Sequence, residues 1–137
     1  MSSAQPSAAS WSKAGARTPL HATSFGKVLL GYSTVEEKQA YCAGELAACT
    51  PQTITDGTAL AAALERIIYD GCATADEEYQ PHLHGLAVPV TRGAEHVEYA
   101  IGLATDAPIS GYMKKQYLSE LRYIAKKIAG IVGRQGQ

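Results

Sequence analysis

Apolar residues first recur at helical spacing in the segment SFGKVLLGY, which starts at Ser24. A hydroxyl at Thr23 or Ser24 can accept a hydrogen bond from the exposed N–H groups of a first turn, so either residue suits an N-cap. The pattern therefore predicts a helix from Ser24 onward. The apolar positions that define its expected face are Phe25, Val28, Leu29 and Tyr32.

A second helix is expected directly after the first. Ser33 and Thr34 each have a glutamate three residues further on, which is the spacing of a capping box. The helix should run from there to about Ala43, and Gly44 should end it.

The clearest helical pattern covers Asp56–Asp70, DGTALAAALERIIYD. Asp56 can cap its first turn, and Gly71 supplies a C-terminal stop. The apolar stripe of this helix consists of Leu60, Leu64, Ile67 and Ile68.

Two segments in the second half of the chain have the character of strands, Leu83–Val90 and Val97–Thr105. The residues between them, 91–96, include Gly93, so the pair is expected to form a hairpin. Pro89 cannot donate a hydrogen bond to a neighbouring strand, which indicates an edge position or a bulge.

The remaining pattern predicts a short strand or extended arm at Thr50–Thr55 and a long last helix from about Ser110 to Val132. Two paired strands with helices before and after them indicate an α+β domain. The sheet is thin for so many helices, which suggests that further strands belong on its N-terminal side. The expected apolar stripe of the last helix is Met113, Tyr117, Leu121, Ile124, Ile128 and Val132.

Composition agrees with one globular domain. A chain of 137 residues can enclose a single core, and 46% hydrophobic with 18% charged residues is ordinary. The net charge of −1 argues against a free-standing nucleic-acid-binding protein. No apolar run approaches the roughly 18 residues of a membrane helix, and the N-terminus lacks the apolar segment of a secretory signal.

The three cysteines, Cys42, Cys49 and Cys72, form no CxxC pair. An odd number without such a pair favours reduced thiols in a cytoplasmic protein. Each is expected to be a small buried apolar residue, with a nucleophilic role for one of them as the alternative.

Gly26-Lys27 invites comparison with a phosphate-binding loop. That loop reads GxxxxGK[ST], and here the upstream glycine is missing and Val28 replaces the hydroxyl residue. The match fails, but a helix N-terminus with hydroxyls at Thr23 and Ser24 can still bind a carboxylate. An ordinary N-cap is the competing interpretation.

The segment DEEYQPHLH, from Asp76 to His84, contains candidate ligands for a metal ion. In a strand, His82 and His84 would share one face, and Glu77 or Glu78 nearby could complete a His/His/carboxylate set. The competing interpretation is an exposed acidic loop ahead of a strand.

A hydrolase is a further, weaker interpretation. Ser24, His21 and Asp76 supply suitable side chains, but the chain has no GxSxG elbow. The lysines and Arg122 of the last helix are balanced by acids elsewhere, so a solvated helix face explains them better than a nucleic-acid surface does.

Five segments in order resemble one known family, the C-terminal effector-binding domain of IclR-type bacterial transcriptional regulators. The resemblance covers about residues 15–133, with 1–14 expected as a flexible lead-in and 134–137 as a tail. The segments are PLHATSFGKVLL from Pro19, TPQTIT from Thr50, the LxxxLxxI helix, GCATADEE from Gly71 and GLAVPV from Gly85.

The resemblance implies a GAF-like α+β domain with an antiparallel-rich twisted sheet flanked by helices. It implies a sensor for an organic acid or aromatic carboxylate, without catalytic activity, cofactor or metal. Partners would be the effector, other copies in a dimer or tetramer, and DNA through a separate winged helix-turn-helix domain. The family's first strands precede the PLHAT segment, so they are expected to be missing here.

The resemblance also implies the effector-binding residues: Thr23, Ser24, Phe25, Asp76 (or its neighbour Ala75), Gly85, Ala104 and Asp106. The family often has Cys where Gly85 stands, and it can have Ser at the positions of Ala104 and Asp106. With the bulky Phe25, these departures favour a ligand larger than glyoxylate, or a vestigial pocket. Two alternatives remain: a metal-dependent enzyme that uses His82, His84 and Asp76, and a fragment that serves only in oligomerisation.

Overall fold

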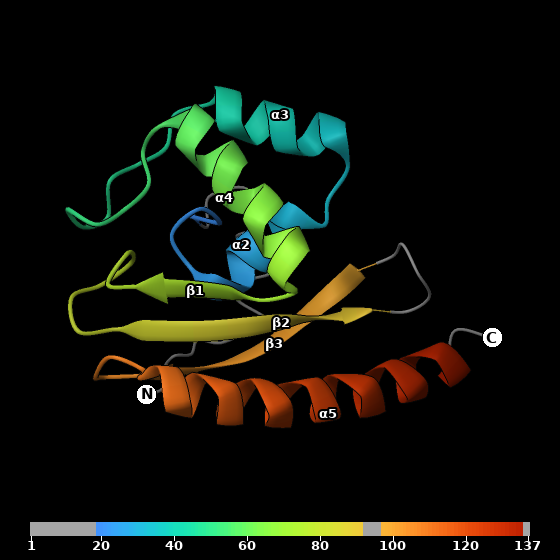
Figure 1. Cartoon of the computed structure of the whole chain (residues 1–137). Helices are drawn as coiled ribbons and strands as arrows, with labels where there is room; N and C mark the ends of the chain where they lie inside the picture. Colours follow the sequence, from blue (N-terminus) through green and yellow to red (C-terminus); the bar gives the residue numbers. More distant parts are fainter. Residues whose placement is uncertain (1–18, 92–96, 136–137) are drawn as a thin grey trace.

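A computed structural model describes residues 19–91 and 97–135. Within these residues three helices come first, then three strands and a last helix, which is the segregated order expected of an α+β domain (Figure 1). In chain order they are α2 (Ser24–Gly31), α3 (Val35–Ala43), α4 (Gly57–Asp70), β1 (Ala73–Asp76), β2 (His84–Thr91), β3 (Val97–Thr105) and α5 (Gly111–Gln135).

The predicted helix ends are confirmed, because local hydrogen bonds determine them. Thr34 and Glu37 form a complete capping box on α3, and the Asp56 carboxylate accepts from the backbone N–H of Ala59 at the start of α4. Gly71 ends α4 in the left-handed conformation, φ +74°, which glycine adopts without a steric penalty.

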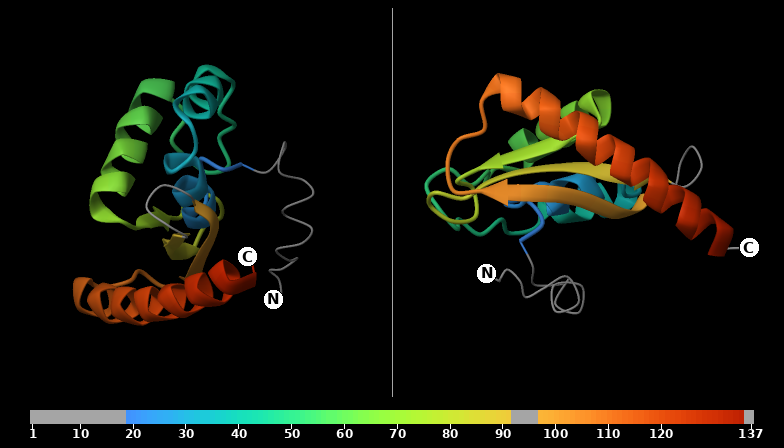
Figure 2. Two further views of the ribbon diagram at one scale, coloured as in Figure 1. Left: turned by 90° about the vertical axis from the view of Figure 1, so that its right-hand side faces the viewer. Right: turned by 90° about the horizontal axis from the view of Figure 1, so that it is seen from below.

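The sheet has the order β1-β2-β3, and both neighbouring pairs are antiparallel. Helices α2, α3 and α4 lie on one face and α5 crosses the other (Figures 1 and 2). The hairpin of β2 and β3 was predicted. β1 was not, because a strand of four residues, ATAD, is too short for its alternation to stand out.

Alternate residues of β2 serve two separate cores. Ala87 faces α2 and α4, where it belongs to a cluster with Val28, Leu60 and Leu64. On the other face, the cluster against α5 consists of Leu86, Val88, Val90, Cys72, Leu121 and Ala125. This alternation is the expected period of a strand that is covered on both faces.

Pro89 fits both parts of its prediction. β2 is the central strand, but β1 pairs only with its residues 84–87, so Pro89 lies beyond the end of β1 and has only β3 beside it. The pairing also shifts register directly afterwards, between Val90 and Thr91.

Other expectations were wrong. Thr50–Thr55 is a loop with a turn rather than the predicted short strand or extended arm, since the Thr53 hydroxyl accepts from the N–H groups of Cys49 and Thr50 and bends the backbone. Ile68 of α4 and Met113 and Ile124 of α5 are exposed, because α2 and α3 cover only one side of α4 and the sheet covers only one side of α5. The burial of Val132 lies outside the described residues.

Helix α2 differs from its predicted amphipathic pattern. It is buried on nearly every side, including Gly26 and Lys27, while Phe25 lies at the surface. Within the described residues, no helix is long and apolar enough to span a membrane.

The tight packing of α2 can be tested with two glycines of the same helix. A Cβ on Gly26 would lie 2.6 Å from Cα and O of Leu20, whereas one on Gly31 would lie 3.5 Å from the nearest atom, in Ile67. We expect Gly26→Ala to lower the free energy of unfolding by about 2 kcal/mol or more. Gly31→Ala should leave it within about 1 kcal/mol. Urea unfolding measures both, and equal effects would contradict the packing described.

Candidate functional site

The N-terminus of α2 is the centre of the expected effector site. Thr23 is its N-cap, with extended backbone and its Oγ1 accepting from the N–H of Gly26 at 3.0 Å. The N–H groups of Ser24 and Phe25 belong to the first turn and have no acceptor within the helix. The positive end of the helix dipole therefore lies at Ser24, which is itself buried.

Gly85 lies directly beneath Ser24. A Cβ on Gly85 would come within 2.8 Å of Ser24 Oγ, so the helix approaches the sheet this closely only because the strand has a glycine here. Gly85 pairs with Ala75 of β1 and Ala104 of β3, which forms a row of small residues across the sheet. Ala104 of this row is exposed, whereas Ala75 and Gly85 are buried, and Phe25, next to Ser24, is exposed.

Asp76 lies on the opposite face. In the strand register Asp76 is opposite His84, and His84 is opposite Thr105. This row is displaced by one residue from the row under Ser24, so its side chains lie on the other face of the sheet. Its Oδ1 is 3.0 Å from His84 Nδ1, and this histidine is buried. On the face toward α2 the corresponding residue is Ala75.

Asp106 follows the end of β3 and is exposed. The structure therefore places the N-terminus of α2, with Thr23 and Ser24, against Gly85 and its strand neighbour Ala104. Phe25 follows Ser24 and has an exposed side chain. It does not place Asp76 on their face.

A buried ion pair next to this site was not foreseen from the sequence. Lys27, one turn beyond Ser24, extends its Nζ to 2.7 Å from Glu78 Oε1, and the two side chains are only 6% and 15% exposed. Glu78 Oε2 also accepts from the backbone N–H of Asp76, at 3.3 Å. The available signal was a lysine in a helical segment with few other polar side chains.

Two threonines fasten the loop at residues 49–53 to the acidic turn after β1. Thr50 Oγ1 donates to the carbonyl of Glu77 at 2.5 Å, and Thr53 Oγ1 donates to the carbonyl of Glu78 at 2.6 Å. The backbone of Glu78, whose carboxylate pairs with Lys27, is therefore held in place by hydrogen bonds from a loop about 25 residues earlier in the chain.

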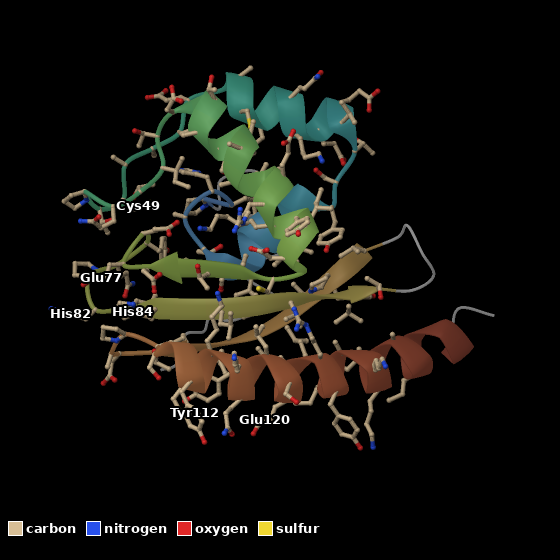
Figure 3. The ribbon with its side chains drawn as sticks, viewed as in Figure 1. Cys49, Glu77, His82, His84, Tyr112 and Glu120 are labelled. Atoms are coloured by element: carbon tan, nitrogen blue, oxygen red, sulfur yellow. The ribbon has the colours of Figure 1, made fainter. Side chains whose placement is uncertain are left out.

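The expected two-histidine face does not form. β2 begins at His84, so His82 lies in the preceding turn, with φ +64° and its side chain in solvent (Figure 3). Its backbone N–H is bonded to Glu77 Oε2 instead. Across residues 19–91 and 97–135, no three His, Cys, Asp or Glu side chains are placed to share a metal ion.

His21 cannot serve Ser24 as a general base, because both ring nitrogens have other partners. Nδ1 lies 3.0 Å from the Tyr41 hydroxyl and Nε2 lies 2.8 Å from the carbonyl oxygen of Ala47. Burial raises the pKa of Tyr41, so this hydroxyl keeps its proton and can donate it to Nδ1. The carbonyl then requires that Nε2 carry the ring proton.

The cysteines meet their expectation only in part. Cys72 is buried and Cys42 is half-buried, but Cys49 is exposed, in the loop between α3 and α4. Burial raises the pKa of Cys42, which disfavours its thiolate and hence a nucleophilic role.

The contact between Ser24 and Gly85 can be tested by a double-mutant cycle. Gly85→Ala should destabilise the domain by roughly 1–3 kcal/mol, because its Cβ overlaps Ser24 Oγ. In a Ser24→Ala background the nearest remaining atom is the Cβ at position 24, at 3.4 Å, so most of that loss should disappear. Equal losses in both backgrounds, measured by urea unfolding, would contradict this geometry.

The Lys27–Glu78 pair can be compared with an exposed pair. Lys27→Met leaves a buried carboxylate without its cation and should cost roughly 3 kcal/mol of unfolding free energy. Arg66→Met breaks the pair with Asp70, whose side chains are 76% and 40% exposed, and should change it by less than about 0.5 kcal/mol. If the two variants were equally stable, the pair would not contribute as its burial implies.

Known proteins resemble this chain in sequence and in fold. The family model described as the bacterial transcriptional regulator IclR C-terminal domain matches residues 2–130. The Escherichia coli HTH-type transcriptional regulator XynR is 34% identical over 72% of this chain and 39% of its own length. The E. coli regulator KdgR is 31% identical over 90% of this chain and 48% of its own, so the chain spans less than half of either relative.

Solved structures of related domains have the same fold as this chain. The C-terminal domain of E. coli KdgR superimposes with a TM-score of 0.77 at 30% identity, over 85% of this chain and 72% of that one. The inducer-binding domain of Acinetobacter PobR, solved as a double mutant with 3-hydroxybenzoic acid, superimposes with a TM-score of 0.73 at 28% identity, over 81% and 65%. Sequence and fold thus agree that the chain belongs to the IclR family of bacterial transcriptional regulators and corresponds to their C-terminal domain.

Proposed function

We propose that this domain senses a small carboxylate at the N-terminus of α2. The observation that carries the proposal is the placement of Ser24 against Gly85, with the dipole of α2 directed at a row of small residues on the sheet. A helix N-terminus stabilises an anion through its free N–H groups and its positive end. Thr23, Ser24, Gly85 and Ala104 would contact the ligand, with Ala75 in place of Asp76.

The surroundings favour a ligand with an apolar body. Gly85, Ala75 and Ala104 bring no hydrogen-bonding side chain to this row, and the ring of Phe25, next to Ser24, is exposed. An aromatic acid can stack against such a ring while its carboxylate faces the helix. The PobR domain, a relative of the same fold, was solved with 3-hydroxybenzoic acid, which has this chemistry.

The domain would act without catalysis and without a cofactor, in the cytoplasm, as the regulatory half of a longer protein. Its relatives are HTH-type regulators about twice as long, so we propose that effector binding here adjusts operator binding by a separate winged helix-turn-helix domain. This requires the effector to bind two arrangements of the oligomer with different affinity. Homo-oligomerisation is part of the proposal.

A thermal-shift panel tests the sensing role. A ligand at about 100 times its Kd adds roughly 2.7 kcal/mol of stability, which raises the melting temperature by several degrees. We expect 3-hydroxybenzoate or a related acid to produce such a shift and its neutral amide, 3-hydroxybenzamide, to produce none. A panel of aromatic and aliphatic acids without any shift would refute the proposal.

The position of the ligand is tested by placing a large side chain at Ala104, the exposed residue of the row with Gly85. Ala104→Trp should abolish the ligand-induced shift without unfolding the domain, since Ala104 is exposed. Ala62→Trp is a matched control, because Ala62 is also exposed but lies on α4. An unchanged affinity in Ala104→Trp, measured by calorimetry, would place the ligand elsewhere.

A further inference from the structure

The two helical layers of the domain carry opposite charge. Residues 19–78, which form α2, α3, α4 and β1, contain nine acidic and three basic residues, a net charge of −6. Between Gly111 and Ile131, helix α5 has five basic residues and one acidic residue, a net charge of +4. Because α5 lies on the other face of the sheet (Figures 1 and 2), the acids that balance its charge in the sequence are not beside it in space.

Three of the cations share one flank of α5. Lys115, Arg122 and Lys126 lie within about 40° of one another around a helix with 3.6 residues per turn, and all three are exposed. Glu120 is two residues from Arg122 and therefore about 160° away. The flank forms a shallow groove lined by Lys115, Leu118, Ser119, Arg122, Tyr123 and Lys126.

Arg122 places this groove on the β1 side of the domain. It donates to the carbonyl of Asp70, the last residue of α4, at 3.1 Å. That residue lies just before β1, and β1 and β3 are the opposite edges of the described sheet. The groove is therefore on the side of α5 away from β3.

The cations of the groove are not used up by contacts within the described part of the chain. The ion pairs there belong to α2, α4 and the segment from β1 to the start of β2. Arg122 has further N–H donors besides the one bonded to Asp70. Lys127 adds another positive charge at the groove, with its Nζ 5.1 Å from the centre of the Tyr123 ring.

We propose that this flank of α5 binds the phosphate backbone of duplex DNA. Lysine, arginine, serine and tyrosine side chains are the usual donors to phosphate oxygens, and the groove has all four types. From Lys115 to Lys126 it runs about 16 Å, along which a duplex presents a dense and regular row of negative charges.

An acidic protein segment fits this groove less well. Protein interfaces centre on buried apolar and aromatic side chains. The aliphatic side chain of the groove, Leu118, is already half-buried, and Tyr123 is held beside Lys127. Charge is thus the main attraction that the groove offers, as expected for a surface that contacts DNA without reading its sequence.

The biological role of this contact rests on the proposed function. About three phosphate contacts bind weakly on their own. If a separate helix-turn-helix domain holds the operator, the DNA is present at an effective concentration on the order of millimolar, and a weak contact then adds to operator affinity. The binding of DNA by α5 itself requires neither that domain nor an effector.

The first experiment is a titration of the isotopically labelled chain with a duplex of about 16 base pairs, followed by NMR at about 20 mM salt. We expect a Kd of roughly 0.1–1 mM and shifts of the backbone amides between Lys115 and Lys127. Three neutralised phosphates predict a salt slope of about −2.7, so about 50 mM salt should weaken binding roughly tenfold. No shifts, or shifts mainly on α3 and α4, would overturn the proposal.

Two matched variants separate the groove from overall charge. Lys126→Gln and Arg66→Gln each remove one exposed positive charge, the first in the groove and the second on α4. Lys126→Gln should weaken DNA binding several-fold and bring the salt slope to about −1.8, and Lys126→Arg should restore both. Arg66→Gln should change affinity by less than about twofold. Equal effects of Lys126→Gln and Arg66→Gln would refute a site on α5.

An acidic polypeptide provides the last comparison. Polyglutamate at the same salt concentration should bind more weakly than the duplex, because its charges are less dense. Tighter binding of polyglutamate to the α5 amides would replace DNA with an acidic protein as the partner and overturn the proposal. These measurements contain no effector, so their failure would leave the thermal-shift test of the sensing role unaffected.

Discussion

The close approach of α2 to the sheet is the constraint on which the rest of the domain depends. This helix contacts all three strands and both α3 and α4, so it is the common neighbour of nearly every element. Its close approach to the sheet is allowed by Gly85, which lies beneath Ser24. Gly26 allows a second close contact, with the backbone of Leu20 in the segment before the helix. A helix of larger residues would pack further out, and the α4 layer would lose its contact with Ala87.

A helix buried on nearly every side offers little solvated surface for a charge, yet α2 contains Lys27. The cost of removing that ammonium group from water is offset by Glu78, and Glu78 in turn is held by backbone and threonine hydroxyl contacts. The result is a polar connection through an otherwise apolar layer. It links the helix at the proposed site to the turn between β1 and β2, and through Thr50 and Thr53 to a loop some 25 residues earlier in the chain.

The parts of the fold that could be predicted were those determined by neighbouring residues. Thr34 with Glu37, Asp56 and Gly71 mark helix ends through contacts within a few positions, and the structure has them. Tertiary packing decided the failures. Helical spacing alone cannot tell which side of α5 meets the sheet. The small Ala125 is buried against the sheet, whereas the larger Ile124 is exposed.

The same division holds for the candidate site. The resemblance to IclR-type domains named Ser24 and Gly85, and the fold places them in contact. It did not resolve Ala75 from Asp76, because a step of one residue along a strand changes the face. The ion pair of Lys27 and Glu78 joins residues 51 positions apart, so no local pattern announced it.

Pro89 limits the sheet on the β1 side. It stands in β2 where β1 has already ended, and without an N–H it cannot donate to a strand that would extend β1 along this side. The four residues of β1 are therefore the full extent of that edge, and an edge so short offers few free backbone groups to another strand.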